Sequence, residues 1–292
     1  MSSPSTHQAS WLPKLVVAPS FIISLLFIYG LMAWNGYLSL SASRLLPNYE
    51  FVGVEHYVAL MDSDRFHVAM SNMAIFGFFF IGGAMALGIF LAILLDQKVR
   101  GEGVLRTIYL YPMAISFIVT GTAWKWILNP GLGLQHLMHS WGFVDFKFEW
   151  LVDQDMAIYC IVIAGVWQSA GFVMALFLAA LRGIDDSIIK AAQVDGASLP
   201  RIYWRIILPS LGPVFFSTLL VVSHLAIKSF DLVMALTAGG PGYATDLPAT
   251  FMYVTAFTRG QIGVGAASAT VMLATVAAIV VPYLYSELRS KR

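Results

Sequence analysis

Charge is scarce in this chain of 292 residues: Asp, Glu, Lys and Arg make up 11% of it. A soluble domain usually carries about 25% charged residues. Hydrophobic residues account for 59% of the chain, and the mean hydropathy is +0.77. A chain this apolar does not fold alone in water. The composition therefore excludes a soluble globular protein and predicts a polytopic membrane protein.

The chain has a single cysteine and no excess of either charge. Cys160 is the only cysteine, so a disulfide within the chain and a cysteine-based metal site are both excluded. The 17 Lys and Arg residues nearly balance the 16 Asp and Glu residues, which gives a net charge of +1. This balance offers no basic surface for nucleic acid and no acidic tail.

Catalytic motifs are absent as well. The chain contains no Gly-x-x-x-x-Gly-Lys-Ser/Thr phosphate loop and no Gly-x-Ser-x-Gly nucleophile turn. The six histidines are scattered, and His136 and His139 have no carboxylate-bearing helix nearby to complete a metal site. We therefore expect no catalytic residue, no metal and no cofactor bound by this chain.

Long apolar runs predict the fold, an all-α bundle of about six transmembrane helices. A bilayer core about 30 Å thick needs about 20 apolar residues of helix, and inside it every backbone polar group must be paired. The first run is too long for a signal peptide and no cleavage site follows it, so it is expected to stay as a helix. The six predicted spans are Leu15–Trp34, Met73–Leu95, Thr107–Trp124, Met156–Leu181, Ile206–Ile227 and Ile262–Ser286.

Basic residues predict the orientation, because Lys and Arg accumulate on the cytoplasmic side of membrane proteins. With six spans both termini share one side, and 11 of the 17 basic residues fall there. Both termini are therefore expected in the cytoplasm. The predicted parts are a tail 1–14, a first helix and outer segment 15–70, a transmembrane domain 71–286 that contains a cytoplasmic loop 182–208, and a tail 287–292.

The cytoplasmic loop 182–208 has a pattern of its own. Asp185–Asp195 begins with acidic residues and has a helical apolar face, and Gly196 follows where a left-handed residue would end the helix. Ser198 and Pro200 then suit the start of a second helix, Arg201–Leu208. The pattern predicts a helix–turn–helix projection; an alternative is a pair of amphipathic helices lying on the membrane surface.

The order of residues in this projection resembles the coupling-loop motif of ABC importer permeases, which reads Glu-Ala-Ala, then Asp-Gly-Ala, then Ile/Leu-Pro. Here a lysine replaces the first glutamate, while the other landmarks and their spacing are present. Small alanines would let a partner surface approach closely, and glycine alone takes a positive φ without steric cost. The residues in question are Lys190, Ala191, Ala192, Asp195, Gly196, Ala197, Ser198 and Pro209.

A second stretch is similar to the outer segment of sugar-type importer permeases. Lys228–Asp231 is followed by Thr237, by the Gly-Gly-Pro of residues 239–241 and by Thr245. The resemblance covers roughly 71–286. It implies a permease of the bacterial inner membrane that pairs with a second, similar permease to form a heterodimer in membrane lipid. Two cytoplasmic ATPase subunits would bind ATP and Mg²⁺, and an external sugar-binding protein would deliver a sugar, such as the monosaccharides glucose or mannose.

Polar residues within the spans are candidates for the substrate path, because such residues are costly in lipid. His224, Lys228 and Asp231 have the spacing of one helix face, where Lys228 and Asp231 could pair. Alternatively, Lys228 only extends to the membrane surface. Trp167, Gln168 and Ser169 could offer a sugar an aromatic plane and hydrogen bonds, or they could join helices.

The alternative function is an ion-coupled secondary carrier that relays protons through Asp231 and His224. Such carriers usually contain internal repeats over more spans than six helices provide.

Overall fold

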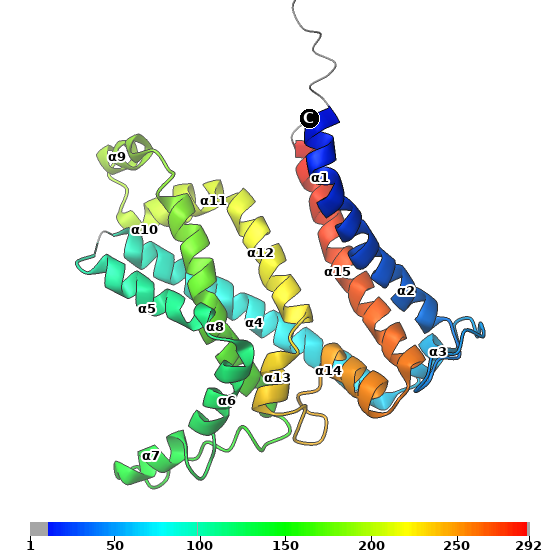
Figure 1. Ribbon diagram of the computed structural model, residues 1–292. Helices are drawn as coiled ribbons and strands as arrows, with labels where there is room; N and C mark the ends of the chain where they lie inside the picture. The colour runs from blue at the N-terminus through cyan, green and yellow to red at the C-terminus, as the bar shows by residue number, and fades with distance from the viewer. Residues whose placement is uncertain (1–10, 98, 291–292) are drawn as a thin grey trace, which may run out of the picture. The chain divides into compact units, whose positions relative to one another are not determined.

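The computed structural model describes residues 11–97 and 99–290, which form helices joined by loops and a single isolated β-bridge (Figure 1). Within these residues, four helices are long and apolar enough to cross a membrane, and six spans result if each of two bent helix pairs counts as one. The predicted all-α membrane fold is confirmed. The predicted tails 1–14 and 287–292 lie partly outside the described residues.

The chain divides into two compact units, which we describe separately. Unit 1 comprises Met1–Asp62 and Met252–Val271, and unit 2 comprises Ser63–Phe251 and Met272–Arg292.

Unit 1 contains a long apolar helix that is packed against little else. A π-helical turn joins its two α-helical parts, and none of the most hydrophobic window of the span Pro13–Ser39 is buried. Asn35 attaches this helix to the start of α15, donating to the carbonyl oxygen of Ala266 at 3.2 Å and to Thr270 Oγ1 at 3.1 Å. The elements are α1 (Trp11–Ser24), η1 (Leu25–Tyr29), α2 (Gly30–Ser39), α3 (Glu55–Met61), η3 (Val254–Thr258) and the first residues of α15 (Ile262–Ser290).

Unit 2 is built around two long helices, α4 (Asp64–Asp96) and α8 (Ala157–Leu181). Gly88 of α4 lies so close to Val173 of α8 that a side chain at Gly88 would collide with it, and Gly83 lies likewise against Val166. The remaining helices are α5 (Glu102–Ala114), α6 (Phe117–Ile127), α7 (Leu134–Ser140), α9 (Asp186–Val194), α10 (Leu199–Ile202), η2 (Tyr203–Ile207), α11 (Leu208–Ser210), α12 (Gly212–Ile227), α13 (Asp231–Leu236) and α14 (Pro248–Tyr253), the last of which continues into unit 1.

Two of the six predicted spans are bent helix pairs rather than straight helices. The predicted span Thr107–Trp124 is split into α5 and α6, which meet at 100°. Pro112 removes a backbone donor before the break, and the side chain of Ser116 accepts the N–H of Val119, which starts a new helix. The fifth span is likewise bent by 72°, between Leu199–Ser210 and α12. α8 and α15 begin within one residue of their predicted starts, whereas α4 begins nine residues earlier, at Asp64.

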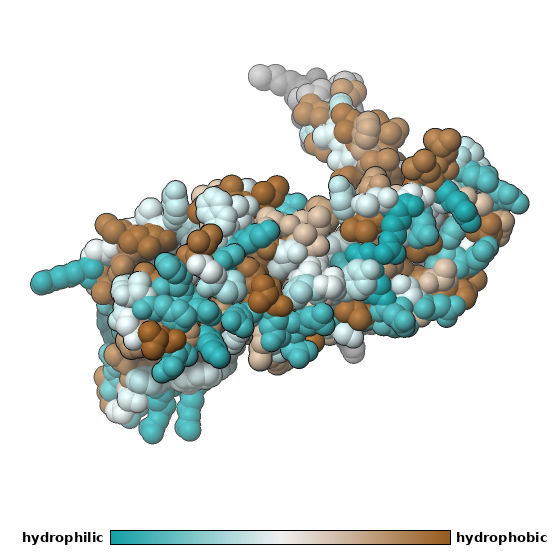
Figure 2. Space-filling view, turned by 90° about the horizontal axis from the view of Figure 1, so that it is seen from below, coloured by the Kyte–Doolittle hydropathy of each residue, from teal (hydrophilic) through white to brown (hydrophobic). Residues whose placement is uncertain are grey.

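Figure 2 views the molecule from below, onto the end of unit 2 that carries α7 and the loop after α13 in Figure 1. Hydrophilic side chains are plentiful on this face and are interspersed with hydrophobic ones. Such a mixture is typical of a surface in contact with water, in contrast to the bare apolar helix of unit 1.

Candidate functional site

The segment that carries the coupling-loop motif begins at a well-capped helix. Asp185 is the N-cap of α9, and its Oδ1 accepts the backbone N–H of Ser187 at 2.8 Å. Hydrogen bonds from Ser187 stabilise the carboxylate and lower the pKa of Asp185 below its usual value. The predicted helix Asp185–Asp195 is therefore present, with these two aspartates as its caps.

Gly196 ends α9 in the left-handed conformation that the sequence predicts, with φ at +77°. Its N–H donates to the carbonyl of Gln193, and the N–H of Ala197 donates to the carbonyl of Ala192, each at 3.0 Å. These two bonds define a Schellman motif, which pairs carbonyl groups that would otherwise be free at the helix end. The turn is exposed, and a side chain at Gly196 would meet no atom within 4 Å, so its constraint is the backbone conformation.

The two faces of α9 differ in exposure. Ala192 is buried at 8% exposure and packs in the core with Ile189, so the side chain of Ala192 faces this chain's own interior. Ile188, Ala191 and Val194 are exposed on the other face, Val194 at 87%. The i, i+3, i+6 spacing makes an apolar stripe on the outside of the helix. The sequence analysis missed Val194, although its i, i+3, i+6 spacing from Ile188 and Ala191 was a usable signal.

Lys190, Asp195, Ser198 and Pro209 are exposed, and Ala197 is half-buried. Ser198 occupies the predicted N-cap position, but its side chain makes no capping hydrogen bond.

The predicted helix Arg201–Leu208 is longer than expected and irregular. It runs from Leu199 to Ser210, and its middle, η2, is a π-helical turn in which the N–H of Leu208 donates to the carbonyl of Tyr203. Pro209 follows at once and has no N–H to donate to Arg205. A helix that changes its hydrogen-bond register before a proline avoids the clash of the ring with that carbonyl.

A polar contact fixes this second helix to the end of α4. The hydroxyl of Tyr203 donates to Asp96 Oδ2 at 2.5 Å and accepts from Gln97 Nε2 at 2.7 Å. The buried side chains of Ile202 and Ile207 hold the same helix from the apolar side. The sequence analysis did not find Tyr203 or Asp96 because their partners lie more than a hundred residues apart.

Gln168 and Ser169 lie where α5 and α6 break apart. Gln168 Nε2 donates to the carbonyl oxygen of Ile115 at 2.6 Å, while its Oε1 has no hydrogen-bond partner among the described residues. Trp167 is partly exposed, and its ring packs edge-on against Trp124 with centroids 5.9 Å apart. A cavity of about 280 Å³ is lined by Met113, Phe117, Gln168, Ser169, Phe172, Val221 and Leu225.

His224, Lys228 and Asp231 do not share one helix, so the predicted common face is wrong. α12 ends at Ile227, and Asp231 is the first residue of α13. An acidic residue in a first turn favours the start of a helix, which explains the interruption. All three side chains are exposed, and no ion pair joins Lys228 to Asp231 in the part of the chain that the structure describes.

The motif after α13 forms a closed outer loop, residues 237–247. The hydroxyls of Thr237 and Thr245 lie 2.7 Å apart, and Thr245 Oγ1 donates to the carbonyl of Gly240 at 2.7 Å. Gly239 and Gly242 both have positive φ, as the tight turns of this loop require.

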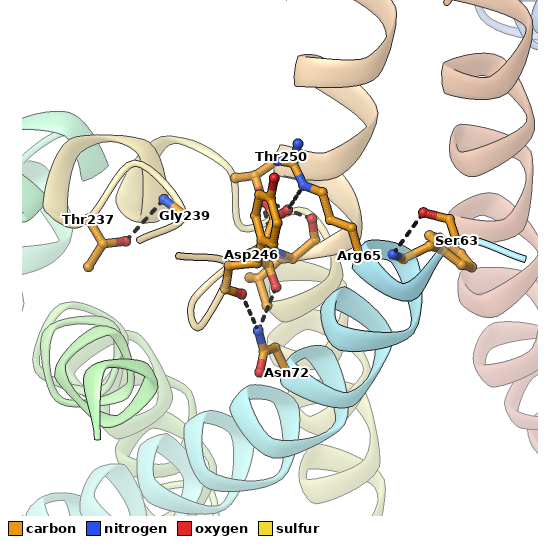
Figure 3. Close-up of polar contacts among 10 residues, drawn as sticks. Ser63, Arg65, Asn72, Thr237, Gly239, Asp246 and Thr250 are labelled. Carbon is orange, nitrogen blue, oxygen red and sulfur yellow. Dashed lines mark hydrogen bonds and ion pairs between the residues drawn. The ribbon is translucent and has the colours of Figure 1, made fainter. Parts of the chain in front are cut away.

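A buried ion pair anchors the outer loop to the first turns of α4 (Figure 3). Arg65 Nε lies 2.5 Å from Asp246 Oδ2, and Asp246 is 1% exposed. Thr250 Oγ1 donates to the other carboxylate oxygen, and Asn72 Nδ2 donates to the carbonyls of Tyr243 and Asp246 at 3.1 and 3.0 Å. As Figure 3 shows, Arg65 and Asn72 both point from α4 toward Asp246. These anchors could not be found from the sequence, since 181 residues separate Arg65 from Asp246.

Comparisons with known proteins agree with the motifs. The chain is 38% identical over 273 residues to a probable ABC transporter permease protein of Pyrococcus horikoshii, covering 93% of this chain and 94% of that protein. It is 35% identical over 269 residues to a xylose/arabinose import permease protein of Haloferax volcanii, covering 91% and 84%. A crystallised bacterial ABC transporter involved in the import of the polysaccharide alginate contains a chain of the same fold, with a TM-score of 0.85, 22% identity and 98% of each chain covered.

The family model described as binding-protein-dependent transport system inner membrane component matches residues 84–290. These residues include all of α8, the coupling-loop motif and the outer loop. The resemblance to importer permeases of the carbohydrate type is thereby confirmed. The chain belongs to the inner membrane components of binding-protein-dependent transport systems, the permease subunits of ABC importers, and has no catalytic domain of its own.

Proposed function

We propose that this chain is one permease of an ATP-driven importer that carries a small sugar, such as the monosaccharides glucose or mannose, across the inner membrane. A second permease, two cytoplasmic ATPase subunits and an external sugar-binding protein complete the complex. The Haloferax volcanii relative is named for xylose/arabinose import, and other relatives are named as sn-glycerol-3-phosphate transport system permeases. These names support a small polyhydroxylated solute.

The single observation that carries the proposal is the exposed projection made by α9 and Gly196. Its outer stripe of Ile188, Ala191 and Val194 has the spacing of a helix that lies in a partner's groove. We therefore propose that this stripe contacts an ATPase subunit and that Lys190, Asp195 and Ser198 lie at the rim of the contact. The charge asymmetry of the loops supports a cytoplasmic location for this projection.

The cavity beside Gln168 is the proposed contribution of this chain to the substrate path. The unpaired Oε1 of Gln168 and the hydroxyl of Ser169 are proposed to bond sugar hydroxyls, and Trp167 directly precedes them on α8. Apolar side chains form the rest of the lining, as is common where a few polar groups select a ligand.

Uptake into proteoliposomes tests the function. The complex is captured through an affinity tag on this chain, reconstituted, and supplied with its external binding protein and radiolabelled glucose, mannose, xylose or glycerol 3-phosphate. We expect uptake that requires ATP on the ATPase side and ceases when the projection is altered. Uptake by this chain alone, driven by a pH gradient, would instead establish the ion-coupled carrier.

A further inference from the structure

The helix α4 is attached at both of its ends to the two loops that matter most for transport. At its first turns, Arg65 and Asn72 hold the outer loop through Asp246 and the backbone of Tyr243. At its last residue, Asp96 holds Tyr203 of the helix that follows the coupling turn. One helix of 33 residues, about 50 Å long, therefore contacts both segments.

The covalent connection between the same two segments is much less straight. It runs through α12, which is bent by 72° from the preceding helix and is interrupted again at Lys228 before α13. α4 has no break between Asp64 and Asp96, and the close packing of Gly83 and Gly88 against α8 stiffens it further. Of the two connections, α4 is the one that can move as a rigid rod.

The contacts at the two ends suit the transmission of force. The Arg65–Asp246 pair is almost fully buried, and the guanidinium also lies over the ring of Tyr243, 4.5 Å from its centroid. The Tyr203 hydroxyl bonds a carboxylate, and such charge-assisted bonds are stronger than neutral ones. These contacts should therefore hold when the outer loop or the helix of Tyr203 is displaced, so that the displacement moves α4 as well.

We propose that α4 transmits movement between the outer loop 237–247 and the coupling segment, residues 185–210 from the N-cap of α9 to the end of α11, with Arg65–Asp246 and Asp96–Tyr203 as the two points of attachment. These residues are positioning residues, since they act on the loops and need not touch the sugar. The proposal rests on the proposed function, in which the coupling segment contacts an ATPase. It adds a route by which the nucleotide state alters the outer surface.

The experiment measures the accessibility of the outer loop while the nucleotide bound to the ATPase subunits is changed. A cysteine replaces Ala244, the complex is reconstituted, and the rate of labelling by a membrane-impermeant maleimide is measured with and without ATP and orthovanadate. Trapped nucleotide is expected to change that rate. Tyr203→Phe removes one hydroxyl at the far end of α4, and we expect it to reduce the nucleotide-dependent change about tenfold, which corresponds to about 1.4 kcal/mol.

Two further comparisons separate transmission from local damage. Tyr57→Phe is the matched control, because it removes a hydroxyl bonded to Ser39 at 2.7 Å within unit 1, and neither residue belongs to α4. It should leave the response unchanged. Arg65→Met should reduce the nucleotide-dependent change in labelling rate as Tyr203→Phe does. The double variant should show the same change as the more strongly affected single variant, because the two contacts act in series and the loss of either one already interrupts transmission. If Arg65→Met does not assemble, Asp246→Asn replaces it, and Asp96→Ala replaces Tyr203→Phe in the same way.

A normal response in Tyr203→Phe, or losses that multiply in the double variant, would overturn the proposal, as would no response in the complex carrying only the cysteine. Sugar uptake by the unaltered complex is measured in parallel. No uptake there contradicts the proposed function, whereas normal uptake with an unresponsive loop contradicts only the role of α4.

Discussion

Gln168 Nε2 donates a 2.6 Å hydrogen bond to the main-chain carbonyl oxygen of Ile115, at the residue where α5 ends. A carbonyl freed by a helix break inside a membrane has no water to bond, and an unpaired one is costly. Gln168 therefore supports the bend between α5 and α6 with the nitrogen of its amide, while the amide oxygen has no hydrogen-bond partner among the described residues.

Replacing Gln168 should lower the stability of the complex. Gln168→Leu removes the donor to Ile115 and should lower the free energy of unfolding by about 1 to 3 kcal/mol, because a buried acceptor loses its partner. Thermal unfolding of the purified complex in detergent measures this. Thr120→Val is the control, since the buried hydroxyl of Thr120 has no partner among the described residues and its loss should be nearly neutral. Equal effects of the two changes would contradict the bend-supporting role.

Gly196→Val should uncouple transport without unfolding the spans. Valine at a φ of +77° is strained by about 1 to 3 kcal/mol, and relief of that strain moves the helix that begins at Leu199. We expect a complex that assembles poorly, or one that hydrolyses ATP without sugar uptake. Gly142→Val is matched, because Gly142 also has a positive φ, +95°, and open space around it, but lies in the loop after α7. Similar defects in both variants would show that strain alone, rather than docking, is responsible.

Val194→Asp should prevent assembly with the ATPase while leaving the chain folded. The side chain is 87% exposed, so the change costs little within this chain, but a charge in an apolar contact is expensive to desolvate. Capture of the ATPase through tagged permease measures the effect. Lys190→Glu, which restores the residue of the family motif on the same exposed helix, should retain capture. Normal ATPase binding by Val194→Asp would exclude the proposed stripe as the contact.

The buried pair of Arg65 and Asp246 should behave non-additively. Arg65→Met leaves the Asp246 carboxylate without its cation at 1% exposure and should destabilise the complex by about 3 to 5 kcal/mol. Adding Asp246→Asn removes the stranded charge, keeps an acceptor for Thr250, and should restore part of the lost stability. Thermal unfolding of the two variants provides the comparison; a double variant less stable than Arg65→Met would mean that the charges do not interact.

The orientation of the chain is open to a direct measurement. A cysteine at Ser198 should react with an impermeant thiol reagent only after the cytoplasmic side is opened, whereas one at Ala244 should react in intact cells. The expectation follows from the distribution of Lys and Arg among the loops. Labelling of both positions from the same side would exclude the six-span topology.

Features encoded locally were predictable from the sequence. The apolar runs identify α4, α8 and α15, because the length of a spanning helix follows from bilayer thickness. The left-handed Gly196 and the helix before it followed from capping rules that involve only neighbouring residues. The prediction for Lys228 and Asp231 was wrong because helical spacing was extended across the interruption between α12 and α13.

Contacts between distant segments could not be derived. The partner of Gln168 is the backbone carbonyl of Ile115, and any residue type carries such a group. This carbonyl is free to accept the hydrogen bond because the helix bends after Pro112. Asp246 and Asp96 each bond a residue more than a hundred positions away.

The glycine contacts between α4 and α8 have a consequence for alternating access. Gly83 and Gly88 bring the backbone of α4 against the side chains of Val166 and Val173, so closely that a methyl group added at either glycine would collide with α8. We therefore expect α4 and α8 to keep this packing in inward- and outward-facing states and to move as one unit. The bend after α5 and the bend before α12 are the places where we expect the helices to change direction during transport.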